Sequence, residues 1–409
     1  MSIDAQSPTS AGNEALQARL ERYTSYESTP DEALALFREA REAGCPVARS
    51  EKLGGYHMFL DYDDVRAAHA DHETFASSPS VLRPIVERPQ FPPIEYDPPE
   101  QTQWRALFAE ALNLQTPKRI EAEVRRDVIE LIDGLRTKGR FDLVDDFAEE
   151  VPLFALCHVL GFDRDKRGEI RRLTVDMHAH AEDPIKGPAA FMAFAEFGIA
   201  EVMSRLEEPR DDYLTHLSTA TIDGRPLTPQ ELGGTMNSLL NAGHGTTVSG
   251  LTSLLYEVYS RPEVKQRLID DPSLIPAAVE ESMRLHTPFF GLYRRATRDV
   301  TVGGVEIAEG DSVQMCWAAA NRDPKVFENP DEFDLDRPLG RKRLMTFGFG
   351  IHVCMGQPTA RMEMHVALEE LLKRVPEIEL DDPAAVRHEF AGSETALITA
   401  LPARLPHNS

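Results

Sequence analysis

The sequence has few cysteines, no long apolar run and no excess of positive charge. Its four cysteines, Cys45, Cys157, Cys316 and Cys354, lie far apart among 409 residues and form no C-x-x-C pair, which argues against a disulfide framework or a structural zinc site. No run of about eighteen apolar residues occurs, and residues 1–12 lack the basic flank and apolar core of a secretion signal. We therefore expect a cytoplasmic protein without a membrane partner, in which at least one thiol is free.

The balance of charge is strongly acidic. Lys and Arg number 44 against 68 Asp and Glu, which gives a net charge of -24. A polyanion such as nucleic acid repels such a chain, so we expect no nucleic-acid partner. Basic residues gather locally at Arg341, Lys342 and Arg343, where an acidic protein partner would find a complementary surface.

Helical patterns dominate, and strand patterns are fewer and clustered. Residues 55–60 form a short apolar run, and residues 299–315 alternate about Gly303 and Gly304, which predicts a hairpin. Residues 86–99 are rich in proline and typical of a loop that serves as a lid or pocket wall. The expected fold class is mainly α with small β-sheets, with residues 1–12 disordered and residues 13–409 forming a single domain. Helices are expected at 31–43, 117–138, 142–160, 188–206, 228–259, 262–269 and 273–285.

The strongest chemical signal is a glycine-rich loop that runs from Phe347 to Cys354 and directly into a helix. The free N–H groups at a helix start can donate to a thiolate and lower its pKa. Gly348, Gly350 and Gly356 remove side chains where backbone must approach a flat ligand closely. A single cysteine in ordinary sequence is more often buried and inert, but this pattern suits a sulfur held against a metal macrocycle.

This segment resembles the heme-binding signature of the cytochrome P450 family, F-x-x-G-x-x-x-C-x-G, which is matched at Phe347, Gly350, Cys354 and Gly356. The resemblance continues across nearly the whole chain. It implies the cytochrome P450 fold, a heme b cofactor (iron protoporphyrin IX) and Cys354 as the metal ligand. It also implies a monooxygenase that inserts one oxygen atom of O2 into its substrate.

A second motif of the family is structural. Glu281 and Arg284 fit the E-x-x-R helix, and Arg337 matches the arginine that completes its charge network. Without the cysteine loop, a Glu and an Arg three apart on a helix would be read as an ordinary surface pair.

Heme carries two propionates, and the planar fork of arginine suits carboxylates well. The resemblance implies Arg105, Arg294 and His352 as the propionate partners, with Arg295 as the alternative to Arg294. Each arginine alone would more often be a surface charge. Gln101 stands where relatives often have histidine.

Residues 242–247, AGHGTT, resemble the oxygen-activation motif A-G-x-[DE]-T-T of the family. The resemblance implies that Ala242 opens the helix above the iron and that Thr246 and Thr247 are catalytic hydroxyls. The alternative for a threonine within a helix is a hydrogen bond to a backbone carbonyl. Gly245 replaces the expected acid, so we expect slower proton delivery and better use of peroxide, while His244 is expected to pack away from the iron.

The family positions also suggest a pocket wall that is mostly apolar. This predicts a small hydrophobic substrate, terpenoid or aromatic, with Ser238 or Asn241 binding one polar group on it. The same residue types are equally typical of a protein core. The predicted wall residues are Val81, Leu82, Ser238, Asn241, Ala242, Phe289, Phe290 and Leu292.

Electrons are expected from ferredoxin and ferredoxin reductase, with ferredoxin docking near Arg105, Arg341, Lys342 and Arg343. Two alternatives remain open. The first is a peroxide-using, oxidative coupling or dehydration enzyme, which Gly245 favours. The second is a heme-thiolate sensor without catalysis, for which Cys354 alone would suffice.

Overall fold

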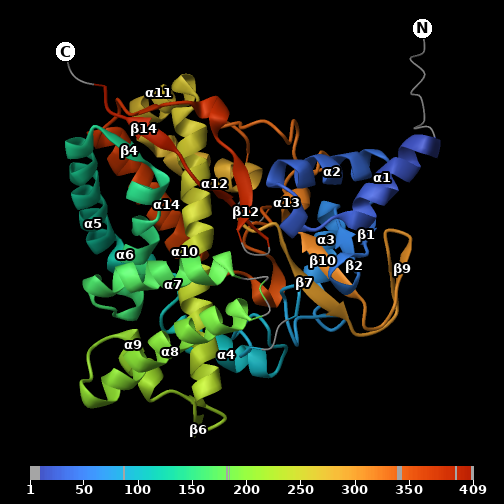
Figure 1. The fold of residues 1–409 in the computed structure, drawn as a ribbon, viewed down its shortest axis with the longest axis horizontal. Coiled ribbons are helices and arrows are strands. Elements are labelled where there is room, and N and C mark those ends of the chain that lie inside the picture. The colour runs from blue at the N-terminus through green and yellow to red at the C-terminus, as the bar shows by residue number, and fades with distance from the viewer. Residues whose placement is uncertain are drawn as a thin grey trace.

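A computed structural model describes residues 10–85, 88–180, 183, 185–338, 343–391 and 394–406. Helices form the larger body, the main sheet lies at one side of it and smaller sheets lie elsewhere around it (Figure 1), which confirms the predicted fold class. Of the residues expected to be disordered, 1–9 lie outside the described part, whereas helix α1 (Ser10–Arg22) begins within that stretch. Among the residues that the structure describes, no helix has the length and apolar character needed to cross a bilayer.

Helix α10 (Pro229–Tyr259) is the longest element of the helical body, and it passes through the middle of that body (Figure 1). Its start is fixed by a capping box, in which the Thr228 hydroxyl accepts from Glu231 N at 3.2 Å and the Glu231 carboxylate accepts from Thr228 N at 2.8 Å. It packs against α6 (Glu150–Leu160), α8 (Lys186–Glu207), α12 (Ile275–Leu285) and α14 (Gln357–Arg374). The remaining helices are α2 (Pro30–Glu42), α3 (Tyr62–Ala70), α4 (Glu100–Ala109), α5 (Thr116–Lys138), α7 (Arg167–Ala179), α9 (Tyr213–Ser218), α11 (Pro262–Asp270) and α13 (Trp317–Ala320).

The main sheet joins segments that are distant in the sequence. Its strand order is β1-β2-β10-β7-β3, antiparallel except where β10 pairs with β2. The hairpin predicted about Gly303 and Gly304 is present as β8 and β9, and both glycines have positive φ, 57° and 81°. The strands are β1 (Val47–Ser50), β2 (Tyr56–Phe59), β3 (Phe75–Ala76), β7 (Gly291–Ala296), β8 (Val300–Val302), β9 (Val305–Ile307) and β10 (Ser312–Cys316).

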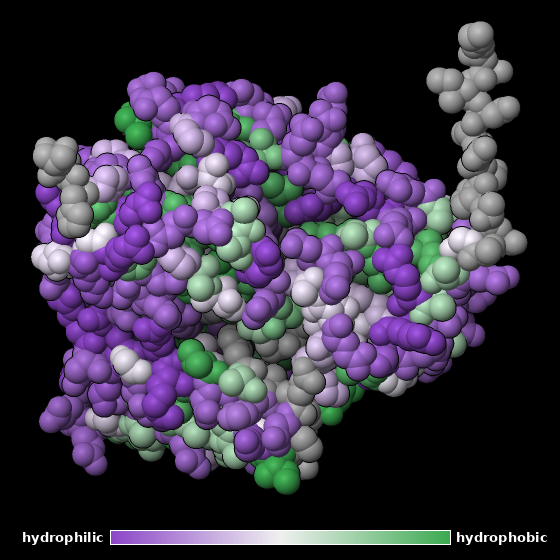
Figure 2. All heavy atoms as spheres, turned by 45° about the horizontal axis from the view of Figure 1, so that its top comes forward, coloured by the Kyte–Doolittle hydropathy of each residue, from purple (hydrophilic) through white to green (hydrophobic). Residues whose placement is uncertain are grey.

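Smaller sheets close the ends of the helical body. A three-stranded sheet of order β11-β14-β4 joins β4 (Arg140–Asp142), β11 (Glu379–Leu380) and β14 (Pro402–Arg404), and two pairs join β5 (Thr221–Ile222) to β6 (Arg225–Pro226) and β12 (His388–Ala391) to β13 (Thr395–Ile398). Figure 2 shows that hydrophilic side chains cover most of the face in view, which agrees with the net charge of -24.

Most expected helices match observed ones closely, and the stretch 142–160 is the instructive exception. There the chain forms strand β4, then a π-helical turn at Val144–Ala148, and only then α6. The Asp142 carboxylate accepts from Val144 N at 2.8 Å and from Leu401 N at 3.0 Å, so the start of the stretch is tied to the C-terminal strand region. A long-range bond of this kind leaves no periodic signal in the local sequence.

Candidate active site

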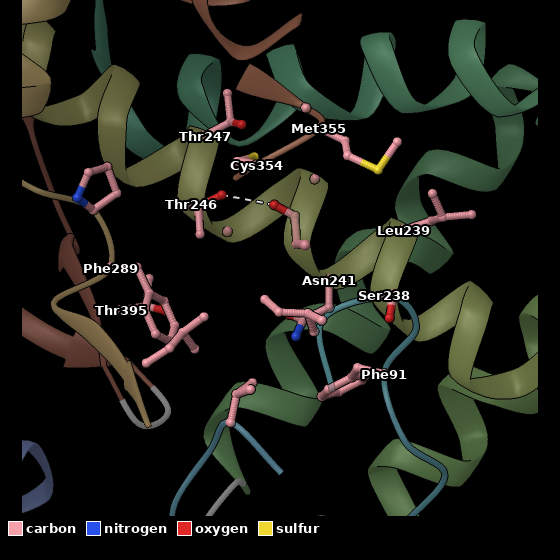
Figure 3. A pocket seen from close by; sticks show the side chains of 18 of the residues that line it. Phe91, Ser238, Leu239, Asn241, Thr246, Thr247, Phe289, Cys354, Met355 and Thr395 are labelled. Atoms are coloured by element: carbon pink, nitrogen blue, oxygen red, sulfur yellow. Dashed lines mark hydrogen bonds between the residues drawn. The ribbon is translucent and has the colours of Figure 1, made fainter. Parts of the chain in front are cut away.

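A cavity of about 420 Å³ lies between α10 and the loop that leads to Cys354 (Figure 3). A volume of this size is typical of small-molecule sites. Most residues predicted from the sequence line it: Val81, Leu82, Arg105, Ser238, Asn241, Ala242, Thr246, Thr247, Phe289, Leu292, Arg294, Phe347, His352, Cys354 and Gly356.

Cys354 is held at the wall of this internal cavity by its loop, and the accessible surface of the residue faces the cavity. Its N–H donates to Phe347 O at 2.9 Å. Gly350 has a φ of 71°, and a Cβ placed on it would lie only 2.5 Å from His69 O, so the loop requires glycine at that point. Burial raises the pKa of the Cys354 thiol, while the N–H groups of Gly356 and Gln357 at the start of α14 lower it. Those N–H groups favour a thiolate once a metal cation supplies the missing positive charge.

The opposite wall is the middle of α10. The Thr246 hydroxyl donates to Ala242 O at 2.8 Å, drawn as the dashed line in Figure 3, so its hydrogen is engaged within the helix and its oxygen remains an acceptor. His244 lies outside the lining, with Nε2 3.1 Å from Glu149 O, and burial lowers its pKa to about 4. His244 therefore packs away from the cavity, as the sequence predicted.

One end of the cavity collects positive charge. Arg294 is buried and donates from Nη1 to Tyr293 O at 2.8 Å, while its Nη2 is buried without a hydrogen bond to any described residue. Arg295 is exposed, because successive side chains of β7 point to opposite faces. Burial lowers the pKa of Arg294 to about 10. Arg294, rather than Arg295, is therefore the cavity-facing cation.

His352 and Arg105 lie at the same end. His352 Nε2 is 3.0 Å from Ser77 Oγ, and its buried Nδ1 has no hydrogen-bond partner in the described structure. Burial, with Arg294 and Arg105 nearby, lowers the pKa of His352 to about 3. Arg105 donates from Nη1 to Val353 O at 3.0 Å, and Gln101 donates from Nε2 to Ile351 O at 2.7 Å, so both brace the loop before Cys354.

Comparisons with known proteins agree with this geometry. The family model described as cytochrome P450 matches residues 189–376. Cytochrome P450 107B1 of Saccharopolyspora erythraea is 31% identical over 381 residues, covering 88% of this chain and 93% of that protein. Mycinamicin IV hydroxylase/epoxidase of Micromonospora griseorubida is 34% identical over 352 residues, covering 83% and 87%. The chain belongs to the cytochrome P450 family.

A solved structure supports the same conclusion for the fold. A mutant of P450 EryK in complex with erythromycin B matches with a TM-score of 0.83 and 28% identity, over 92% of this chain and 97% of that one. The chain is thus a cytochrome P450 monooxygenase, and the family implies a heme-thiolate cofactor.

The residues of this P450 fit such a group. Heme presents two carboxylates at one edge, and the cavity holds buried nitrogen atoms without partners, Arg294 Nη2 and His352 Nδ1, at one end. Donors of this kind form strong bonds with carboxylates. The Cys354 sulfur lies in the same cavity with two backbone N–H groups directed at it.

The structural network of the P450 is assembled as predicted. Arg284 Nε and Nη2 each lie 2.8 Å from the Glu281 carboxylate, and Arg337 Nε lies 2.9 Å from Glu281 Oε1. Arg284 also donates to the carbonyls of Asn321 at 3.0 Å and Pro330 at 2.6 Å. The network therefore ties α12 to the irregular segment that precedes the cysteine loop.

Phe290 is a correction to the predicted pocket wall. Its ring is 2% exposed and packs edge-on against Phe390 in the core beside α2, outside the cavity lining. Gly348 also lies outside the lining, where a Cβ placed on it would be 3.5 Å from Trp317. The prediction for Phe290 was wrong because adjacent residues of an extended segment face opposite sides.

The structure describes only some of the residues at which ferredoxin was expected to dock. Arg341 and Lys342 lie outside the described residues, and Arg343 is exposed. Arg105 lines the cavity and is half-buried, so its guanidinium belongs to the interior rather than to the docking surface.

The cavity residues that the sequence analysis missed include two ionisable ones, His69 and Glu363. His69 of α3 lines the cavity and accepts a hydrogen bond from Trp317. Glu363 of α14 is 4% exposed and lines the cavity without a hydrogen bond to any described residue, and burial raises its pKa well above the usual range. Neither lies in a segment whose pattern marked it, and a buried helix position is ordinarily read as core.

Proposed function

We propose that this P450 is a ferredoxin-dependent monooxygenase that inserts one oxygen atom of O2 into a small hydrophobic substrate, terpenoid or aromatic. The observation that carries the proposal is the placement of the Cys354 sulfur and the Thr246 hydroxyl in the walls of one cavity, with Arg105, Arg294 and His352 at its charged end. When bound through a thiolate, heme supplies the activation of dioxygen.

Each residue then has a physical task. Cys354 ligates the iron, and the N–H groups of Gly356 and Gln357 stabilise its negative charge. Arg105, Arg294 and His352 bind the propionates and fix the orientation of the group. Thr246 and Thr247 hold a water molecule or a proton donor near the oxygen-binding side, while Ala242 leaves room there.

The substrate class follows from the wall beyond Thr246. Phe91, Phe289 and Leu292 make it apolar, while Ser238 Oγ is buried and has no hydrogen-bond partner among the described residues (Figure 3). A buried hydroxyl left without a partner is unfavourable, so a substrate with one polar group matches the wall. A related solved structure, cytochrome P450 CREJ, with a TM-score of 0.83 and 28% identity, is in complex with (4-ethylphenyl) dihydrogen phosphate.

A peroxide-driven reaction is the second candidate, and Gly245 favours it. Gly245 lines the cavity before Thr246 and brings no carboxylate to that position. Hydrogen peroxide already carries the two electrons and two protons that dioxygen would have to receive, so fewer protons need to be delivered from solvent through that position. Turnover with peroxide in the absence of ferredoxin and its reductase tests this candidate.

The decisive experiment replaces the sulfur. The parent should give the red-shifted absorption band of thiolate-ligated ferrous heme with carbon monoxide, and Cys354→Ser should lose it. An unchanged carbon monoxide spectrum in Cys354→Ser would contradict the proposal. Substrate class is then tested on the parent by titrating terpenoids, phenols and aromatic acids and recording the shift of the Soret band, with Ser238→Ala expected to weaken only ligands that carry a polar group.

A further inference from the structure

His69 and Trp317 form a buried pair at the charged end of the cavity. His69 lies near the end of α3 and Trp317 begins α13, and their side chains are both largely buried. Trp317 Nε1 lies 2.6 Å from His69 Nε2, and the two rings are stacked with centroids 5.7 Å apart. Because an indole N–H can only donate, His69 Nε2 must be the acceptor.

This bond fixes the tautomer of His69. A neutral imidazole has one N–H and one acceptor nitrogen, so an accepting Nε2 places the proton on Nδ1. Burial lowers the pKa of His69 well below its usual value, and the nearby Arg294 and His352 lower it further. The ring is therefore neutral, with a single donor at Nδ1.

The remaining donor has no partner in the part of the chain that the structure describes. His69 Nδ1 makes no hydrogen bond to any described residue, although the ring lines the cavity. Its Cε1, between the two nitrogens, would lie 3.7 Å from a Cβ placed on Gly348, so the ring abuts the loop that carries Cys354. Arg294 and His352, which both lower the pKa of His69, each have a buried nitrogen without a hydrogen bond to any described residue as well.

We propose that His69 is a further heme-binding residue, whose Nδ1–H, set by Trp317, donates to a propionate beside Arg294 and His352. The inference rests on the proposed function, because it requires heme in this cavity. A neutral donor adds a charge-assisted bond without another cation next to Arg294.

Two amide substitutions distinguish the effect of the His69 Nδ1 donor from the effect of side-chain packing. In asparagine the amide nitrogen occupies roughly the place of His Nδ1, whereas the glutamine side chain extends roughly to the place of Nε2. His69→Asn therefore retains a donor toward the cavity, and His69→Gln retains only an acceptor for Trp317. We expect the rate of heme transfer to excess apomyoglobin to rise about tenfold in His69→Gln and to stay within about twofold of the parent in His69→Asn.

Two further variants complete the test. Trp317→Phe removes the donor that holds the proton of His69 on Nδ1, so it should also speed heme release. His216→Gln, at an exposed position of α9, is the control and should leave the rate of heme release unchanged. The propionate bands in resonance Raman spectra should shift in His69→Gln and in Trp317→Phe alone. Heme release from His69→Gln at the parent rate overturns the inference. Release from His69→Asn that is as fast as release from His69→Gln also overturns it, because the residue would then act through packing and not through its donor. If the parent protein itself lacks the thiolate spectrum with carbon monoxide, the proposed function fails instead.

Discussion

Phe289 and Phe290 are neighbours in the sequence, but their rings lie on opposite sides of the segment that leads into β7. Phe289 lines the cavity (Figure 3). Phe290 packs against Phe390 with ring centroids 4.8 Å apart and an interplanar angle of 84°. The backbone holds this arrangement, since Phe290 N donates to Glu394 O at 2.9 Å and Ala318 N donates to Phe290 O at 3.2 Å.

Truncating the Phe290 ring should therefore affect mainly stability, and truncating the Phe289 ring should affect mainly ligand binding. Phe290→Ala should lower the free energy of unfolding by about 3–5 kcal/mol, because it opens a void in a packed core. Phe289→Ala should change stability much less but should weaken the binding of aromatic ligands, measured from the Soret shift. Urea unfolding and ligand titration on both variants check the pair. A larger loss of ligand affinity in Phe290→Ala than in Phe289→Ala would contradict the assignment.

Glu281→Gln should be strongly destabilising. The Glu281 carboxylate is 1% exposed and neutralises Arg284 and Arg337, which are 0% and 7% exposed. Its loss leaves two guanidinium groups buried without a counter-charge, an effect of about 3–5 kcal/mol in the free energy of unfolding. Asp336→Asn is the matched control, because its 2.6 Å pair with Arg267 is exposed and should matter little. Equal midpoints of urea unfolding for the two variants would show that the buried network is not what stabilises this region.

The parts of the site that were predictable lie within continuous segments. The loop from Phe347 to Cys354 and the motif that ends at Thr247 each place their residues by local backbone geometry, so spacing along the chain fixes spacing in space. The choice of Arg294 over Arg295 required only that successive side chains of strand β7 face opposite sides. These features did not depend on knowing how the sheet meets the helices.

The parts that were missed depend on packing between distant segments. His69 and Trp317 are 248 residues apart, and the bond that orients His69 exists only after α3 and α13 have packed together. Glu363 is one of several buried residues on α14, and only the position of the cavity distinguishes it from core. The prediction for Phe290 was wrong for a related reason, because two adjacent aromatic residues in the sequence do not reveal which ring faces the cavity.

Gly245→Asp should improve coupling of electron transfer to product formation. The substitution brings a carboxylate to the helix position before Thr246, whose own hydroxyl hydrogen is engaged with Ala242 O at 2.8 Å. A general acid within reach of a reacting oxygen typically accelerates proton transfer by about 100-fold or more, so product formed per NADH should rise and the solvent isotope effect should fall. Unchanged coupling together with an unchanged isotope effect would show that Gly245 does not limit proton delivery.

Glu394 provides a pH-dependent term in stability. Its carboxyl group is buried where β13 meets the main sheet, accepts from Tyr293 OH at 2.9 Å and from Ser25 Oγ at 3.1 Å, and has no guanidinium or ammonium partner among the described residues. Burial raises the pKa of Glu394 to about 8. The carboxyl is therefore protonated near neutral pH in the folded protein, whereas in the unfolded chain it ionises at its ordinary pKa of about 4.3.

The sign of the effect follows from proton uptake. Between the unfolded and folded pKa values the folded state binds more protons, so stability falls as pH rises through that window and is constant above it. Glu394→Gln is neutral at every pH and should remove this slope, so the variant should gain relative to the parent from pH 5 to pH 8, by on the order of a few kcal/mol in the free energy of unfolding. Urea unfolding at each pH measures the difference, with exposed Glu389→Gln on β12 as the control for loss of a negative charge. A difference between Glu394→Gln and the parent that stays constant from pH 5 to pH 9 would mean that Glu394 keeps its ordinary pKa in the folded protein.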